Sequence, residues 1–174
     1  MEGKKQKRVP LVIFALLSLI GSATGCSLIG VPQWSGSGFI KKEFLEYRSV
    51  AVLPFEGDSA GEVSNTFARS FHEKFPQMVI VERKRLLGAL REEDLYPGRL
   101  DEATRSKIGK AFDVQALIMG SVYYPSILRW LLQVIVVDTE TGAVLGRSYV
   151  EVNFIGAEGV KDGCDLAVQK LTPR

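Results

Sequence analysis

The segment Val114-Gln-Ala-Leu-Ile-Met-Gly-Ser-Val-Tyr123 decides the fold of this 174-residue chain. Nearly all of its residues are apolar, whereas a strand with one face in water alternates apolar and polar side chains. We therefore expect residues 114–123 to form a central β-strand that other elements cover on both faces.

Two strands and a closing helix follow this segment. Residues 128–137 and 143–154 are rich in β-branched side chains and flank Asp138-Thr-Glu-Thr-Gly142. Because this turn places a glycine where a left-handed backbone is needed, it predicts a hairpin. Residues 156–171 carry Val160, Cys164, Ala167 and Leu171 at helical spacing, so Cys164 is expected to be a buried core residue.

The elements before the central strand alternate between strands and helices. Residues 49–54 and 78–81 are short apolar runs that predict buried strands. Between them, Ser59 and Glu62 have the spacing of a capping box. The helix that follows is expected to place a stripe of four residues in the core: Val63, Phe67, Phe71 and Phe75.

Two more helices are expected before the central strand. Residues 83–91 would turn three leucines inward, Leu86, Leu87 and Leu90. Asp101 would cap the next helix, with an inward stripe of Thr104, Ile108, Ala111 and Phe112. The order β-α-β-α-α-β-β-β-α predicts an α/β sandwich with a mixed sheet of about five strands flanked by helices.

The amino terminus has the order of a secretory signal. A basic segment, residues 4–8, precedes the ten-residue apolar block 11–20 and then the small residues 21–25. A membrane-spanning helix needs ~20 apolar residues, so this block is too short to be a permanent span. Residues 1–25 are therefore interpreted as a signal peptide.

The motif Ala23-Thr24-Gly25-Cys26 resembles the bacterial lipobox. This resemblance implies that Cys26 becomes the first residue and carries palmitate-type acyl chains, which anchor a protein firmly when more than one is present. The alternative is ordinary signal cleavage, which leaves Cys26 free or paired with Cys164. Since Ser27 and not Asp follows the cysteine, the resemblance also implies the periplasmic face of the outer membrane.

The domain organisation follows from composition. Residues 27–38 are rich in Gly, Ser and Pro, which predicts a flexible tether with a reach of about 40 Å when extended. We assign residues 26–40 to the lipidated terminus and tether, and residues 41–174 to the periplasmic domain. Removing residues 1–25 leaves 18 basic and 19 acidic residues, a net charge of −1, which argues against nucleic-acid binding.

Four segments in order resemble one family: residues 50–55, 81–87, 111–120 and 134–145. They are similar to the periplasmic α/β domain shared by the curli-secretion lipoprotein CsgG, the penicillin-binding-protein activator LpoB and the amino-terminal domain of TolB. CsgG inserts long hairpins that build a membrane barrel. Here the corresponding connections, residues 124–128 and 155–157, are shorter than the two strands of ~9–11 residues that a hairpin needs. We therefore expect no pore from this chain alone.

The sequence offers few residues that could form a catalytic site. The chain has one histidine, His72, which follows Phe71 and precedes Glu73, so we interpret it as a solvated residue of a helix. The loop 57–61 lacks a basic residue to hold a phosphate, and its carboxylates favour a capped turn. We expect no enzyme activity, no metal, no cofactor and no small-molecule substrate.

Aromatic and apolar residues cluster at the connection where CsgG would extend its first hairpin. Tyr123, Tyr124, Ile127 and Trp130 are candidate contacts with a partner protein, because aromatic side chains are enriched in interfaces. The alternative for Trp130 is that it points into the core with Leu128 and Leu132.

The function that these observations favour is a non-enzymatic assembly or adaptor module of the cell envelope. It would bind other envelope proteins or copies of itself. The alternatives are an activator of a peptidoglycan synthase, as the LpoB resemblance implies, and an accessory subunit of a CsgG-like secretion assembly. The short tether disfavours the activator, which must reach an enzyme of the inner membrane.

Replacing the lipobox cysteine tests the anchor. We expect Cys26→Ala to move the chain from the membrane pellet to the soluble fraction after cell lysis, because the acyl chains supply the membrane affinity. Mass spectrometry of the wild-type amino terminus should find a triacylated Cys26. Unchanged membrane retention of the variant would contradict this expectation.

Overall fold

The computed structural model describes residues 33–81, 83–88, 100–126, 129–153 and 159–174, all within one unit that spans Pro32–Arg174. Cys26, Ile127 and Leu90 therefore lie outside the described residues. In the described part of the chain, no helix is long and apolar enough to cross a bilayer.

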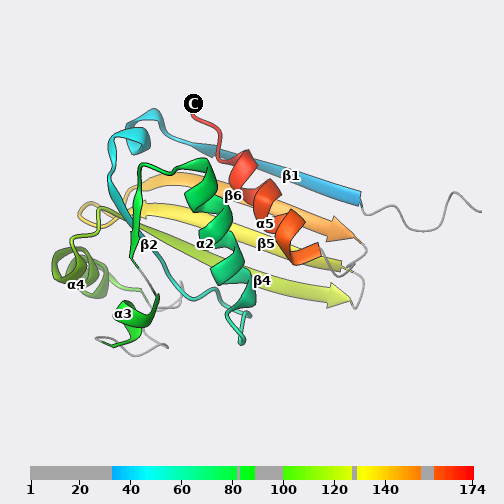
Figure 1. Cartoon of the computed structure of the whole chain (residues 1–174), viewed down its shortest axis with the longest axis horizontal. Helices are drawn as coiled ribbons and strands as arrows, with labels where there is room; N and C mark the ends of the chain where they lie inside the picture. Colours follow the sequence, from blue (N-terminus) through cyan, green and yellow to red (C-terminus); the bar gives the residue numbers. More distant parts are fainter. Residues whose placement is uncertain (1–32, 82, 89–99, 127–128, 154–158) are drawn as a thin grey trace, which may run out of the picture. The chain divides into compact units, whose positions relative to one another are not determined.

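Six strands form one mixed sheet in the order β1-β6-β5-β4-β2-β3 (Figure 1). β2 pairs in parallel with both β3 and β4, whereas the β4–β5, β5–β6 and β1–β6 pairs are antiparallel. The strands are β1 (Gln33–Ile40), β2 (Ser49–Val52), β3 (Val79–Val81), β4 (Ala116–Ser126), β5 (Arg129–Asp138) and β6 (Val144–Asn153). The predicted α/β sandwich with a mixed sheet is confirmed, with one strand more than expected.

Helices pack on both faces of the sheet. The helices are η1 (Lys42–Glu46, a 3-10 turn), α2 (Glu62–Lys74), α3 (Arg83–Leu87), α4 (Glu102–Phe112) and α5 (Gly159–Lys170). α2 and α5 lie side by side over one face (Figure 1). Residues of α3 and α4 join a second core on the other face. β2 contributes to both cores, because its successive residues point to opposite sides of the sheet.

The predictions of a tether up to residue 38 and of a domain that begins at residue 41 are wrong for residues 33–40, because Gln33–Ile40 is an edge strand. β1 pairs with β6 from Gln33↔Asn153 to Ile40↔Gly146. Its glycines serve close packing: a Cβ on Gly38 would lie 2.6 Å from the carbonyl oxygen of Arg147 and 2.9 Å from that of Lys170. The Gly/Ser composition that suggested flexibility instead lets the end of α5 approach the strand.

The predicted stripe of α2 is confirmed as the centre of the larger core. Val63, Phe67, Phe71 and Phe75 are all buried. Phe44 of η1 joins them, with its ring centroid 6.2 Å from that of Phe71 and 6.0 Å from that of Phe75. Edge-to-face aromatic pairs of this kind add to the free energy of burial.

The second core forms beneath α4. Its predicted cap is confirmed, since the Asp101 carboxylate accepts a hydrogen bond from the Thr104 amide at 2.7 Å. Ile108 is fully buried, but Ala111 is exposed and that part of the predicted stripe is wrong. Ile108 and the half-buried Phe112 already occupy the side of α4 that faces the sheet.

The predicted hairpin between β5 and β6 is confirmed, with Gly142 in the left-handed region at φ 72°. Asp138 organises the turn: one carboxylate oxygen accepts from the amides of Glu140 at 2.9 Å and Thr141 at 2.6 Å. The other oxygen accepts from the Tyr47 hydroxyl at 2.5 Å. Burial acts to raise the pKa of Asp138, but these hydrogen bonds outweigh it and hold the pKa below its ordinary value.

Removing this carboxylate tests its role in the fold. We expect Asp138→Ala to lower the free energy of unfolding by roughly 1–2 kcal/mol at pH 7, whereas Glu140→Ala in the same turn has little effect. A carboxyl with a depressed folded-state pKa stabilises above its ordinary value of 3.8 and loses that contribution at lower pH. In urea unfolding, the free energies of unfolding of the wild type and of Asp138→Ala should therefore converge as the pH falls below that value. A gap that widens in acid would contradict this account.

Candidate functional site

The two candidate contact tyrosines lie at the exposed end of β4. Tyr123 is 65% exposed and Tyr124 is 51% exposed, which makes them two of the four large hydrophobic side chains that the described residues expose. The ladder between β4 and β5 shifts register between Tyr123 and Ser126, so the regular hairpin loosens there. We call Tyr123, Tyr124 and the adjoining strand ends the hairpin end.

The rings of the hairpin end point to opposite faces of the sheet. Tyr123 pairs with Leu131 on the face away from α2 and α5. The pKa of Tyr124 is raised, first by burial and then by the negative charges of Asp58 and Glu62, which places Tyr124 near the start of α2. A partner at this end would therefore meet an aromatic side chain on either face.

Trp130 is a core residue and not a contact residue. Its side chain is 1% exposed, and a Cβ on Gly163 of α5 would lie only 2.5 Å from its ring. The indole Nε1 has no hydrogen-bond partner among the described residues. The prediction of a partner contact is wrong for Trp130. Its alternative is correct for Trp130 and Leu132, because alternate residues of β5 face the helices, whereas Leu128 lies outside the described residues.

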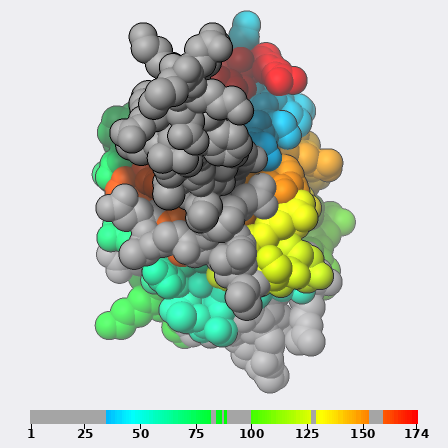
Figure 2. Space-filling view, turned by 90° about the vertical axis from the view of Figure 1, so that its right-hand side faces the viewer, coloured from blue at the N-terminus to red at the C-terminus, as the bar shows by residue number. Residues whose placement is uncertain are grey.

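The amino-terminal strand begins at the same end of the sheet. Gln33 of β1 pairs with Asn153, which pairs in turn with Arg129, and Arg129 pairs with Ser126 of β4. Figure 2 looks onto this end, where β1 in blue, β6 in orange and β5 in yellow follow one another across the surface. The chain therefore enters the sheet beside the hairpin end.

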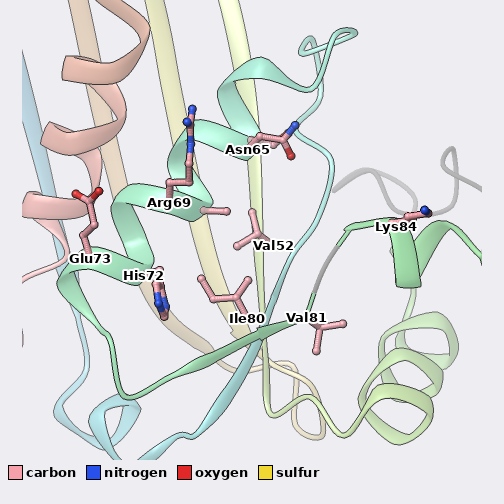
Figure 3. Close-up of a pocket in the computed structure, with 10 residues that line it drawn as sticks. Val52, Asn65, Arg69, His72, Glu73, Ile80, Val81 and Lys84 are labelled. Carbon is pink, nitrogen blue, oxygen red and sulfur yellow. The ribbon is translucent and has the colours of Figure 1, made fainter.

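A groove separates α2 from the opposite edge of the sheet (Figure 3). Its volume is ≈ 760 Å³. The apolar lining consists of Val52, Ala68, Ile80 and Val81, of which Val81 belongs to the second core. Polar side chains of α2 and α3 form the rim: Asn65, Arg69, His72, Glu73 and Lys84. We call this feature the α2–β3 groove.

Sequence reasoning missed the groove, although it described some of its residues. His72 is exposed on α2, as the sequence predicts, and stands on the rim of the groove. Asn65, Arg69 and His72 recur at intervals of four and three residues, so they share one helix face. That periodic polar face is the signal in the sequence, but its partners on β3 and α3 become neighbours only in the fold.

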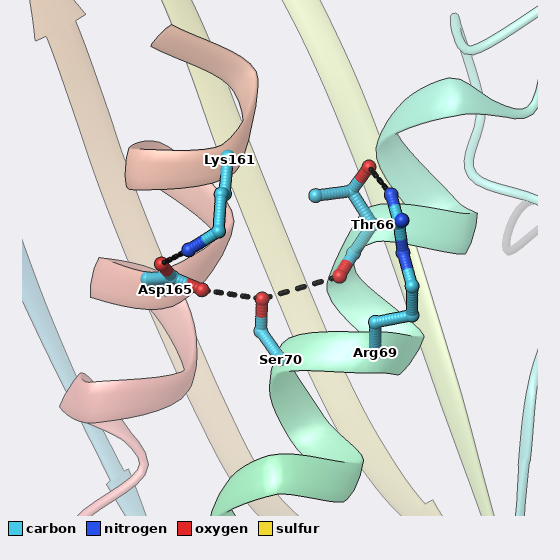
Figure 4. A network of polar contacts seen from close by, with 5 residues as sticks. All are labelled: Thr66, Arg69, Ser70, Lys161 and Asp165. Carbon is cyan, nitrogen blue, oxygen red and sulfur yellow. Dashed lines mark hydrogen bonds and ion pairs between the residues drawn. The ribbon is translucent and has the colours of Figure 1, made fainter. Parts of the chain in front are cut away.

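The side of α2 away from the groove is tied to α5 (Figure 4). Ser70 Oγ donates to Asp165 Oδ1 at 2.5 Å, and Lys161 Nζ donates to the other oxygen of that carboxylate at 2.6 Å. Lys74 Nζ donates to the carbonyl oxygens of Val168 at 2.8 Å and Gln169 at 3.1 Å, which caps the end of α5. These contacts fix α2 and so fix one wall of the groove.

Two described groups with nucleophilic or acid–base chemistry, Cys164 and Tyr47, are committed to the structure. Cys164 is fully buried as predicted, and burial raises its pKa to about 12, so the thiol stays protonated. In a polar hollow of ≈ 600 Å³ beside η1, Tyr47 has a raised pKa because of burial and Asp138. Neither group is suited to proton transfer near neutral pH. Among the described residues, no group of three or more His, Cys, Asp or Glu could hold a metal.

Asp58 caps α2, so the predicted capping box of Ser59 and Glu62 is wrong. The Asp58 carboxylate is buried and accepts from the Val63 amide at 3.2 Å and the Ser64 amide at 2.8 Å. Gly61, at φ 72°, begins the helix without a side-chain cap of its own. Since a carboxylate already occupies the helix amino terminus, the loop 57–61 is a capped turn and leaves no room there for a phosphate.

The chain was compared with proteins of known family, annotation or structure. No family model and no curated protein matches it. Among solved structures it is similar to the PelC dodecamer from Paraburkholderia phytofirmans, with a TM-score of 0.52 and 10% identity, over 83% of this chain and 99% of that one. At this level of identity the likeness concerns the fold alone.

Two further solved structures are similar over a smaller share of the chain. The LpoB C-terminal domain from Salmonella enterica has a TM-score of 0.48 and 15% identity, over 61% of this chain and 82% of that one. Lipoprotein GNA1162 from Neisseria meningitidis has a TM-score of 0.49 and 15% identity, over 63% and 82% respectively. The specific likeness to CsgG and TolB stays a prediction.

A pair of substitutions distinguishes the two caps proposed for α2. We expect Asp58→Ala to lower the free energy of unfolding by about 1–2 kcal/mol, because two helix amides lose a buried acceptor. Ser59→Ala should change it by less than about 0.5 kcal/mol, since Ser59 is exposed and accepts no hydrogen bond from the helix. Thermal unfolding followed by circular dichroism measures both. The reverse ranking would restore the capping box.

Proposed function

We propose that this chain is a lipid-anchored protein of the cell envelope, at the periplasmic face of the outer membrane, and that it acts as an assembly module through protein–protein contacts. Its contacts would include copies of itself. The observation that carries the proposal is a fold likeness that spans 99% of a protein solved as a dodecamer. The lipobox at Cys26 supplies the anchor.

The short connection to the anchor orients the domain. Six residues, 27–32, separate Cys26 from β1, so the attachment point lies within about 25 Å of Gln33 even when the chain is fully extended. Because β1 begins beside the hairpin end, that end faces the bilayer in this proposal. Tyr123 and Tyr124 would then meet partners close to the membrane surface. The connection is shorter than the sequence suggested, which further disfavours an activator of a distant inner-membrane enzyme.

The sheet offers surface for contact between copies. The face of β1, β6 and β5 opposite α2 and α5 turns Ser37, Gln133 and Arg147 to solvent. The two edges of the sheet, β1 and β3, lie on opposite sides of the domain (Figure 1). A contact between two different surfaces of successive copies generates a closed ring when its rotation closes.

The chemistry of the described residues supports a binding role over a catalytic one. Asp58, Asp138 and Asp165 each accept several hydrogen bonds that hold structural elements together. Cys164 is buried and protonated. These groups would have to leave their structural contacts before they could serve a reaction.

Mass measurement and crosslinking test the proposal. The full chain, extracted from membranes in mild detergent, should give a discrete oligomer by native mass spectrometry or a stable complex with another envelope protein. A photocrosslinking residue at position 123 or 124 should capture that partner or a second copy in intact cells, whereas the same residue at Lys107 of α4 should not. A monomer that yields no crosslink from either tyrosine position would contradict the proposal.

A further inference from the structure

The α2–β3 groove leaves apolar side chains open to a ligand. Ala68 of α2 and Ile80 of β3 are half-buried, and both line the groove together with the buried Val52. The groove volume of ≈ 760 Å³ is within the ~300–1,000 Å³ of ordinary ligand sites. A ligand with an apolar part would remove these side chains from water and gain affinity by doing so.

The groove is elongated along α2. The α2 residues on its rim recur at intervals of four and three from Asn65 to His72, so they follow one face of the helix. At a rise of ~1.5 Å per residue, this part of the face is about 10 Å long. Such a shape suits an extended chain better than a compact ring system.

An acyl chain fits this groove better than a peptide does. A peptide added as a strand on β3 would point alternate side chains to opposite faces of the sheet, so half of them would leave the groove. A peptide that lay wholly within the groove would bury its N–H and C=O groups against apolar side chains. An acyl chain has neither constraint, because it is apolar along its whole length.

The rim supplies positive charge for an anionic head group. The apolar lining lies between Arg69 of α2 and Lys84 of α3 (Figure 3). Arg69 donates to the Thr66 hydroxyl at 3.0 Å, and neither Arg69 nor Lys84 forms an ion pair with a carboxylate of the described residues. Glu73 is the one acidic side chain among the described residues of the lining. Two cations against one carboxylate give the lining a net positive charge, which favours an anionic head group.

We infer that the α2–β3 groove binds a fatty acid, with its acyl chain on the apolar lining and its carboxylate beside Arg69 and Lys84. One wall of the groove is formed in advance, because Asp58, Ser70 and Lys74 fix α2 to the loop 57–61 and to α5. A rigid wall lowers the cost of ordering on binding. The inference goes beyond the proposed function, since the contacts of the hairpin end do not require a ligand in the groove.

Photoaffinity labelling tests the inference. The probe is a lauric acid analogue with a diazirine at the far end of its chain, and its control is the uncharged methyl ester. Each is added to native membrane vesicles that contain the full chain, which is recovered after irradiation for peptide mass spectrometry. We expect the acid to label the peptides that contain α2 and β3 at least fivefold more strongly than the ester does. An excess of unlabelled lauric acid should suppress this labelling.

Charge reversal tests the contribution of the rim. The Arg69→Glu/Lys84→Glu variant should lower the labelling by the acid at least fivefold, because two carboxylates then repel the head group. The matched reversal Lys107→Glu/Lys110→Glu on α4 should leave the labelling unchanged. Circular dichroism of both variants checks that the fold is retained.

A second pair of variants tests the apolar lining. Ala68→Leu fills part of the groove and should lower the labelling without a change in net charge. Ala68→Ser leaves the space open and should retain most of the labelling. This pair keeps the inference testable even if the charge reversal disturbs the fold.

Several outcomes would overturn the inference. These are equal labelling by the acid and the ester, labelling that unlabelled lauric acid does not suppress, and unchanged labelling of Ala68→Leu. If Arg69→Glu/Lys84→Glu instead dissociates an oligomer, a second copy covers the groove, and the assignment to a fatty acid is overturned. The native mass of the wild-type chain tests the proposed function separately, because it does not depend on the probe.

Discussion

The packing of α2 against the sheet is the constraint on which the other features depend. The ring centroids of Phe67 and Phe71 are 6.1 Å apart, and those of Phe71 and Phe75 are 4.7 Å apart. One face of the helix therefore fills the larger core. The buried Asp58 carboxylate fixes the start of this helix, and Lys74 near its end caps α5. Because α2 is held on these sides, its remaining face can line the groove without being part of the core.

The same arrangement separates two surfaces of the domain. The hairpin end carries Tyr123 and Tyr124 and lies at the end of the sheet where β1 begins. β3 and the α2–β3 groove lie at the opposite edge of the sheet from β1. The domain therefore offers two surfaces that do not overlap.

Local patterns predicted the parts of the fold that depend on near neighbours. The aromatic stripe of α2, the Asp101 cap and the left-handed Gly142 each follow from residues a few positions apart. β1 could not be predicted in this way, because its glycines have a reason only when β6 and α5 lie beside them. The choice between core and contact for Trp130 likewise needed the direction of each β5 side chain, and the groove needed three elements brought together.

The central claim is that other proteins cover the hairpin end in the envelope. Hydrogen–deuterium exchange, compared between the chain in native membrane vesicles and the same chain purified in detergent, measures this directly. The account predicts slower exchange in the vesicles at residues 123–124, with little change in α4. Identical exchange at those positions in the two preparations would contradict it.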